Sequence, residues 1–323
     1  MRQMQSFGRR LHDDNTFIMR HFLLPATLVC VLLSSGAHAG DRLNPDLLSA
    51  VVKIVTAPPS ETGTGFLVST TGDVSGKTLL ITNKHMVGDW NYADRDIRTY
   101  HPWIDVFFYR TGEDPSGQAF RPTRISLVNA TGTLDSSRVR LHPQPGIDLV
   151  AIDVTDKIND VSNQHIRSFA FDKTYTVPFD KIRDFQTDIA DEVIALGYPL
   201  GISSQRNDYP IAKIGYLASI PGEEVSIPFP VVNRAGVATI TTVEGKFVIV
   251  DGLIVPGNSG SPVVLVGGIR SRRDPQTNQL QFSTKPIPNL VIGVVSGSLG
   301  GSGLSVVISV DYVLDLLKEL SSK

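Results

Sequence analysis

The chain has 323 residues, of which 41% are hydrophobic and 19% are charged, and its formal net charge is -2. This length and composition exclude a disordered protein and are enough for two ordinary globular domains or one large one. The near-neutral charge gives no support to nucleic-acid binding, and the one basic cluster, Arg270, Arg272 and Arg273, is expected at a solvated hairpin tip. We therefore expect no nucleic-acid partner.

Residues 1–39 are interpreted as a signal peptide and not as part of the fold. From Met19, a basic start leads into an apolar run of signal-peptide length, and the sequence AHA at 37–39 suits cleavage before Gly40. The apolar run is too short to span a membrane, and an uncleaved anchor is the alternative interpretation. Residues 1–18 are interpreted as an upstream extension from a start codon assigned too early.

The only cysteine, Cys30, falls within this signal peptide. The mature chain therefore cannot form a disulfide, which fits a bacterial exported protein better than a eukaryotic extracellular one. We expect the mature protein in the bacterial periplasm or outside the cell, with no membrane span after signal cleavage.

Many short runs rich in Val, Ile, Thr and aromatic residues follow residue 47, bounded by Gly, Pro, Asn or Asp. Such runs predict an all-β fold built as a sandwich or barrel. They form two sets separated by a polar, charged stretch, so we expect two barrels joined by a linker. The predicted parts are an N-terminal barrel at 40–155, a linker at 156–190 and a C-terminal barrel at 191–323.

The polar segments 88–102 and 112–146 are predicted to be surface loops of the first barrel. Close to the C terminus, residues 311–320 begin with an acidic residue and carry a late lysine, as a helix prefers. Their apolar residues recur at helical spacing and predict one helix. These residues are Val313, Leu314, Leu317 and Leu320.

The segment PGNSGSP at 256–262 is either an ordinary tight turn or a turn that presents a serine to a substrate. Serine catalysis needs a base beside the hydroxyl and a third group that orients the base. His85 closes the apolar run TLLITNKHMV, so a buried strand would deliver it to a barrel rim. The other mature histidines, His101, His142 and His165, are expected at the surface.

Asp148 opens the apolar strand in GIDLVAIDV. A carboxylate that enters a core needs a partner such as an imidazole N–H or a backbone amide. Asp153 lies farther along the same strand and is expected to be a solvated strand-end carboxylate. Asp148 is therefore the better candidate to orient His85.

His85 in TNKHMV, Asp148 in DLVAIDV and Ser259 in PGNSGSP occur in the order found in the chymotrypsin-like serine proteases, which the chain resembles. The segments TGTGFLVS, DEVIALGYPLG and KIGYLASI are similar to the bacterial HtrA-type branch. The resemblance covers most of 47–320 and implies two six-stranded antiparallel β-barrels with a C-terminal helix. An α/β-hydrolase is disfavoured, because its acid and histidine would follow the serine.

The resemblance implies that Ser259 is the nucleophile, His85 the general base and then acid, and Asp148 the group that orients the imidazole. The backbone N–H groups of Gly257 and Ser259 would form the oxyanion hole. These roles predict a serine endopeptidase that hydrolyses polypeptide substrates through an acyl-enzyme. No cofactor and no metal are expected.

Two positions depart from the familiar pattern around the nucleophile. Asn258 stands where the zymogen-activated animal enzymes carry an aspartate, so we expect no activation by pairing with a new N-terminal amine. Ser261 stands where a glycine is usual, and its hydroxyl is expected to crowd the site slightly. We keep Ser259 as the nucleophile.

The specificity pocket is also implied by the resemblance. Leu253 would lie at its floor, Ser296 on its wall strand and Gly303 on the opposite wall. Because the floor has no carboxylate, cleavage after Lys or Arg would lack its counter-charge. We expect a small or medium apolar residue, such as Val, Ala or Leu, before the cleaved bond.

A binding module with a protease fold and an idle triad is the alternative function. A collapsed oxyanion turn or a filled pocket would favour this binding module. HtrA-type enzymes often carry a PDZ domain and assemble as trimers. This chain ends three residues after the predicted helix, so no PDZ domain is expected and no oligomeric state is predicted.

Overall fold

The fold is described from a computed structural model in which all the described residues belong to one unit, Ala39–Lys323. The described residues are 43, 45–70, 76–91, 96–109, 122–159, 170–171, 175–204, 208–232, 238–252, 254–273, 276–282 and 286–321. The predicted signal peptide, His165 and Leu253 lie outside these ranges.

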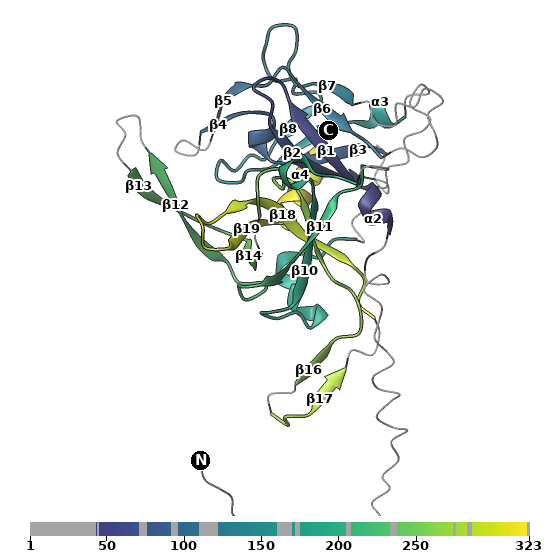
Figure 1. The fold of residues 1–323 in the computed structure, drawn as a ribbon, viewed down its shortest axis with the longest axis vertical. Coiled ribbons are helices and arrows are strands. Elements are labelled where there is room, and N and C mark those ends of the chain that lie inside the picture. The colour runs from purple at the N-terminus through teal and green to yellow at the C-terminus, as the bar shows by residue number, and fades with distance from the viewer. Residues whose placement is uncertain are drawn as a thin grey trace, which may run out of the picture. The chain divides into compact units, whose positions relative to one another are not determined.

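The first half of the chain forms a curled seven-stranded antiparallel sheet (Figure 1). Because side chains alternate between the two faces of a strand, each strand buries one row inside the curl, including Ile54, Leu67, Leu80 and Ile152. The strand order is β7 (Thr123–Ser126), β6 (Trp103–Phe107), β1 (Val51–Thr56), β2 (Thr62–Ser69), β3 (Thr78–Thr82), β9 (Val150–Asp153) and β8 (Val139–Leu141).

The second half forms a closed antiparallel barrel of six strands. Its interior is filled by β-branched and leucine side chains such as Val193, Leu217, Val263 and Val307. The strand order is β10 (Glu192–Gly197), β11 (Ile211–Leu217), β14 (Phe247–Asp251), β19 (Leu304–Ser309), β18 (Leu290–Ser298) and β15 (Pro262–Leu265).

This is the chymotrypsin-like, all-β fold that the resemblance implies. The second barrel has the six strands expected. The first is a curled sheet of seven strands in place of a closed six-stranded barrel, because the edge strands β7 and β8 do not pair with each other in the described residues.

A third core cluster joins the sheet to the barrel. Its members come from the outer faces of both, including Val51, Phe66 and Ile81 on one side and Leu196 and Val264 on the other. Each such side chain contributes roughly 1.5–3 kcal/mol when it is fully buried. The contact is therefore a packed layer that can hold side chains from the two halves in fixed register.

Helix α4 (Val310–Ser321) confirms the helix predicted for 311–320. It packs Val313 and Leu316 into the cluster that joins the two halves. The described residues also contain short helices that the sequence did not predict. These are α2 (Pro45–Ser49), α3 (Thr155–Ile158), η2 (Lys84–Met86), η5 (Phe179–Phe185) and η6 (Pro199–Gly201).

The prediction of surface loops at 88–102 and 112–146 was wrong where these segments form strands, and residues 110–121 lie outside the described ranges. The first segment forms the hairpin of β4 (Gly88–Asn91) and β5 (Asp96–Tyr100), and the second contributes β7 and β8. These strands have three to five residues each and bury single side chains such as Ile97 and Ile125, so their alternating pattern is too short to recognise.

Two hairpins extend from the second barrel (Figure 1). One pairs β12 (Val225–Val232) with β13 (Ala238–Gly245), and the other pairs β16 (Ser271–Arg273) with β17 (Leu280–Phe282). None of the helices within the described ranges is long and apolar enough to cross a membrane.

Candidate active site

His85 and Asp148 meet at one end of the paired strands β3 and β9. His85 follows β3 and Asp148 precedes β9, and the two strands pair through Thr82 and Val150. His85 Nδ1 lies 2.7 Å from Asp148 Oδ2, and the His85 backbone N–H donates to Asp148 Oδ1 at 3.2 Å. The Asn83 side-chain amide donates to the Asp148 carbonyl at 2.8 Å. The carboxylate therefore fixes both the backbone and the ring of His85.

The charge of Asp148 controls the basicity of His85. Burial by itself lowers the pKa of His85, but the charge and hydrogen bond of Asp148, assisted by the charge of Glu61, outweigh burial and raise this pKa above its ordinary value. Burial also lowers the pKa of the neighbouring Lys84, against the opposing charges of Asp148 and Asp96. The imidazole is thus held ready to accept a proton and to be stabilised as imidazolium.

Ser259 lies in a tight turn between β14 and β15 and is half-buried. Every carbonyl oxygen of residues 256–259 has a hydrogen-bond donor, so the orientation of each peptide plane is fixed. The donors are the Leu200 N–H to Pro256 O at 2.7 Å, Thr64 Oγ1 to Gly257 O at 2.7 Å, the Ser261 N–H to Asn258 O at 2.9 Å and the Thr64 N–H to Ser259 O at 2.8 Å.

The backbone amides of Gly257 and Ser259 are the candidate oxyanion hole. In a trans peptide the N–H points opposite to the C=O. Because Pro256 O points at Leu200, the Gly257 N–H points to the other side of the turn. Within the described ranges neither the Gly257 N–H nor the Ser259 N–H has an acceptor.

Only glycine suits position 257. Its φ is +96°, in the region that disfavours other residues, and a Cβ there would lie 2.2 Å from the Tyr198 carbonyl oxygen. The turn therefore uses a glycine to bring its backbone against the segment that follows β10.

Ser261 and Asn258 lie beneath the turn. Both are completely buried, and a Cβ on Gly197 would lie 2.1 Å from Ser261 Oγ and 2.9 Å from Asn258 Oδ1. The Ser261 hydroxyl has no hydrogen-bond partner among the described residues. It faces Gly197 of β10 in the interior, so the half-buried Ser259 remains the candidate nucleophile.

Ser259 is joined to the sheet that carries His85. The Thr64 N–H that holds Ser259 O belongs to β2, and β2 pairs with β3 through Phe66 and Ile81. No hydrogen bond between Ser259 Oγ and His85 Nε2 occurs among the described residues. A bond between a nucleophile and its base often tightens only when substrate binds.

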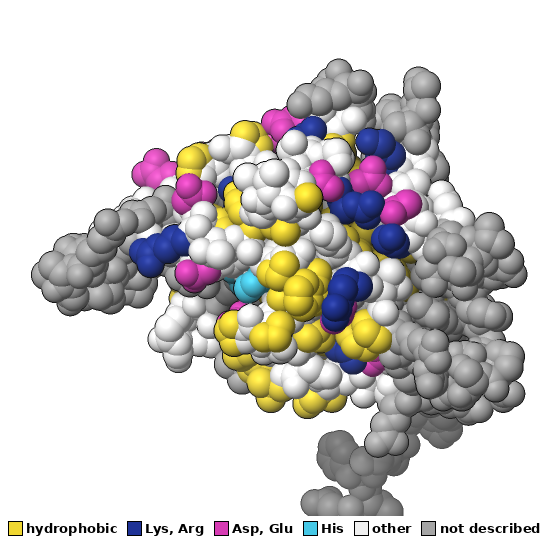
Figure 2. All heavy atoms as spheres, turned by 90° about the horizontal axis from the view of Figure 1, so that it is seen from above, with side chains coloured by type: hydrophobic (Ala, Val, Ile, Leu, Met, Phe, Trp, Pro, Cys, Tyr) yellow, Lys and Arg dark blue, Asp and Glu magenta, His cyan; other side chains and the backbone are white. Residues whose placement is uncertain are grey.

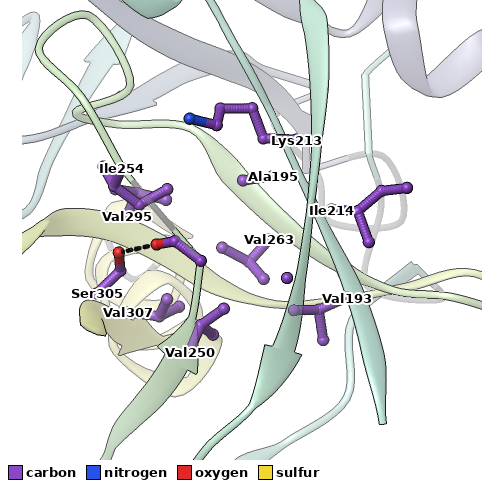
Figure 3. Close-up of a pocket in the computed structure, with 12 residues that line it drawn as sticks. Val193, Ala195, Lys213, Ile214, Val250, Ile254, Val263, Val295, Ser305 and Val307 are labelled. Carbon is purple, nitrogen blue, oxygen red and sulfur yellow. Dashed lines mark hydrogen bonds between the residues drawn. The ribbon is translucent and has the colours of Figure 1, made fainter. Parts of the chain in front are cut away.

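A small hollow, partly open to solvent, lies in the second barrel (Figure 3). Five of its twelve lining residues are valines, and Ile254 and Ala195 add further apolar surface. The Ser305 hydroxyl, also in the lining, donates to Gly252 O at 2.6 Å. Figure 3 shows Lys213 along one edge of the hollow, on the side of Ala195.

The hollow adjoins the residues predicted for the specificity pocket. Ser296 directly follows Val295, a lining residue whose backbone bonds to Gly260 and Ser261. The Gly303 carbonyl accepts the N–H of Gly252, which is also part of the lining. Leu253 lies outside the described residues, but its neighbours Gly252 and Ile254 both line the hollow.

His142 is not a surface residue as predicted. It is 5% exposed, and its ring packs edge-on against Tyr312 with 5.2 Å between ring centroids. Burial, followed by the charge of Lys84, lowers the pKa of His142. Because it is buried directly after β8 and against Tyr312 of α4, we interpret it as a structural histidine.

Sequence reasoning missed Thr64, Asn83 and Leu200, which position the candidate catalytic groups. In the sequence, the segment TGTGFLVS is informative only through its similarity to the HtrA-type branch. The residue type of Thr64 does not indicate its role, because its hydroxyl bonds to backbone atoms more than 130 residues away along the chain.

No group of three or more metal-ligating side chains occurs in the part of the chain that the structure describes.

On the face shown in Figure 2, a histidine lies beside a group of hydrophobic side chains. Exposed hydrophobic residues near the candidate turn include Leu200 at 67% and Ile202 at 54%.

A comparison with models of known protein families identifies the family of this chain. A family model described as a trypsin-like peptidase domain matches residues 63–268. No match was found among curated proteins.

Several solved structures are similar to the chain. The active form of the Rv3671c protease from M. tuberculosis has 17% identity and a TM-score of 0.44, with 85% of this chain and 83% of that chain covered. A serine-to-alanine variant of the HtrA-type protease AlgW, with a tripeptide, has 16% identity and a TM-score of 0.45, with 85% of this chain and 61% of that chain covered.

Proposed function

Because the chain belongs to the trypsin-like peptidase domain family, we propose that this serine protease is an endopeptidase that cleaves polypeptides through an acyl-enzyme. The observation that carries the proposal is the His85–Asp148 pair, with 2.7 Å between Nδ1 and Oδ2. The pair lies in a molecule whose Ser259 turn keeps two amides without acceptors in the described residues.

In this mechanism Ser259 Oγ attacks the carbonyl carbon of the substrate. Its proton passes to His85 Nε2, while Asp148 holds Nδ1–H and stabilises the imidazolium. The Gly257 and Ser259 amides bind the oxyanion, and each such donor is typically worth ~3 kcal/mol in the transition state. His85 then gives its proton to the leaving amine, and water repeats the sequence on the acyl-enzyme.

We propose that the residue before the cleaved bond is small or medium-sized and apolar, such as Val, Ala or Leu. The valine-rich lining of the hollow beside Ser296 and Gly303 supports this preference. Lys213 adds a positive charge at the edge of the hollow, with no carboxylate partner among the described residues. A lysine or arginine side chain of a substrate would be repelled there.

The binding module with an idle triad is not favoured. A collapsed oxyanion turn would leave the Gly257 N–H turned toward protein acceptors, whereas Pro256 O accepts the Leu200 N–H and holds this peptide the other way. This orientation of the peptide supports a working enzyme.

The proposed chemistry needs only side chains, backbone amides and water, so no cofactor or metal is part of the proposal. The signal-peptide features of residues 1–39 support export to the bacterial periplasm or the extracellular space.

Cleavage-site profiling tests the proposal. The purified protein and its Ser259→Ala variant are incubated with a denatured protein mixture, and the new peptide ends are identified by mass spectrometry. We expect new ends after Val, Ala or Leu with the parent protein and none with the variant. Equal patterns from both proteins would contradict the proposal.

A further inference from the structure

Thr64 is completely buried in β2, at the layer between the sheet and the barrel. Its hydroxyl donates to the Gly257 carbonyl at 2.7 Å and accepts the Tyr198 N–H at 3.1 Å. Because a hydroxyl has one proton, the bond accepted from Tyr198 leaves that proton for Gly257. The hydroxyl therefore joins three segments of the chain in one fixed arrangement.

The two segments held by Thr64 are those that set the direction of the Gly257 N–H. Tyr198 begins the segment whose Leu200 N–H holds Pro256 O, and this bond turns the Gly257 N–H outward. Gly257 O is the next carbonyl of the same turn. Fixing both carbonyls fixes the peptide planes on either side of the Gly257 Cα.

No other side chain of the described residues bonds to the backbone of 256–259. The Thr64 backbone reinforces the same contact, because its N–H donates to Ser259 O at 2.8 Å and its carbonyl accepts the Thr82 hydroxyl at 2.7 Å. Since β2 pairs with β3, the strand that orients the turn also adjoins the strand that leads to His85.

We propose that Thr64 is a positioning residue that keeps the oxyanion hole open and in register with His85. This inference rests on the proposed function of the site. The Thr64 hydroxyl does not touch substrate; it acts through the orientation of the Gly257 amide. Because the site is buried, a valine in its place would leave Gly257 O and the Tyr198 N–H without a partner. Conformations of the 256–259 turn in which the Gly257 N–H points away from the oxyanion position would then become populated.

The test is the kinetics of labelling by a fluorophosphonate probe, measured on the purified full chain. The maximal labelling rate, kinact, reports the oxyanion hole and triad, while KI reports binding of the probe. For Thr64→Val we expect kinact to fall about 10- to 100-fold, because loss of one oxyanion donor costs about 100- to 1,000-fold and misorientation is a partial loss. KI should stay close to the parent value.

Thr64→Ser keeps the hydroxyl and should restore kinact, and Thr64→Cys, with a weak donor, should lie between serine and valine. Ser309→Ala is the matched control, because Ser309 is also completely buried and its hydroxyl accepts only the Asp311 N–H at 3.2 Å. This control should lower the melting temperature without changing kinact.

A folded Thr64→Val variant with the parent kinact would overturn the inference and leave the proposed function standing. An equal fall in kinact for Ser309→Ala would overturn it as well, because the effect would then follow stability alone. If Thr64→Val does not fold, equal kinact values for the parent protein, Thr64→Ser and Thr64→Cys would overturn the inference. Failure of the parent chain to be labelled would overturn both proposals.

Discussion

The two oxygens of Asp148 hold two different atoms of His85: Oδ2 lies 2.7 Å from Nδ1, and Oδ1 accepts the backbone N–H at 3.2 Å. The ring and the peptide that carries it are therefore oriented by one carboxylate. The proton on Nδ1 faces Asp148, which leaves Nε2 as the atom able to take a proton from Ser259.

Asp148→Asn should leave the protein folded and lower kcat by about 10,000-fold, because an amide cannot hold the required tautomer or stabilise imidazolium. Peptide hydrolysis assays on the purified variant measure this loss. Asp153→Asn is the control, since Asp153 lies at the other end of β9 and pairs with Lys77 at 3.5 Å. Similar losses in both variants would argue against a specific role for Asp148.

The acid limb of the kcat/KM profile should have its midpoint above pH 6.5, the ordinary pKa of histidine. His85 must be neutral to act as a base, and Asp148 and Glu61 outweigh burial to raise its pKa. Glu61→Gln should move the midpoint to lower pH. A midpoint below 6.5 in the parent protein would contradict the electrostatic account of the site.

Gly257→Ala should lower labelling of Ser259 by a fluorophosphonate at least about 100-fold, because the oxyanion turn must shift. A Cβ at position 257 would lie 2.2 Å from the Tyr198 carbonyl. Gly132→Ala is a matched control, since Gly132 also has a positive φ, of +78°, but nothing lies within 4 Å of its Cβ position. The control should cost about 1 kcal/mol of stability and no activity.

Lys213→Glu should let the enzyme cleave after Lys and Arg, because a carboxylate at the edge of the apolar hollow would provide their counter-charge. Lys213→Met should keep the apolar preference, with the charge removed and the length retained. Competing peptide substrates, separated by mass, measure the change. An unchanged preference in Lys213→Glu would show that the hollow does not receive the substrate side chain.

His142 should reduce stability at acid pH. Its pKa is lowered by burial and then by Lys84, against the opposing effects of Asp315, Gln144 and Glu319. A depressed histidine pKa means that the stabilisation is present above about pH 6.5 and is lost as pH falls through the folded value. His142→Phe should therefore lose less thermal stability between pH 7.5 and pH 5 than the parent protein does. A larger loss would contradict this.

The long apolar runs made the main features of the fold predictable. Strands such as β2, β14 and β18 bury both faces, so their composition alone identifies them, and the pattern at 311–320 identified α4. The hairpin of β4 and β5 could not be found, because strands this short carry one or two buried residues. Strands β13 and β14 could not be told apart, because only Lys246 lies between them and residues 238–252 form one continuous β-type run.

The candidate site was only partly predictable for a similar reason. His85, Asp148 and Ser259 have reactive side chains, so their order along the chain carries information. Thr64 and Leu200 act on peptide groups, and nothing in the residue type indicates which distant carbonyl a threonine hydroxyl or a leucine N–H will meet. Such contacts become visible only when the two halves are packed together.

The central claim is that Ser259 is an activated nucleophile, and the most direct test is mass spectrometry of the purified protein after treatment with a fluorophosphonate probe. We predict a single adduct on Ser259 that is absent from Ser259→Ala and strongly reduced in His85→Ala. Ser261→Ala should still be labelled, because Ser261 is completely buried. A folded protein without an adduct, or with the adduct on Ser261, would contradict the account.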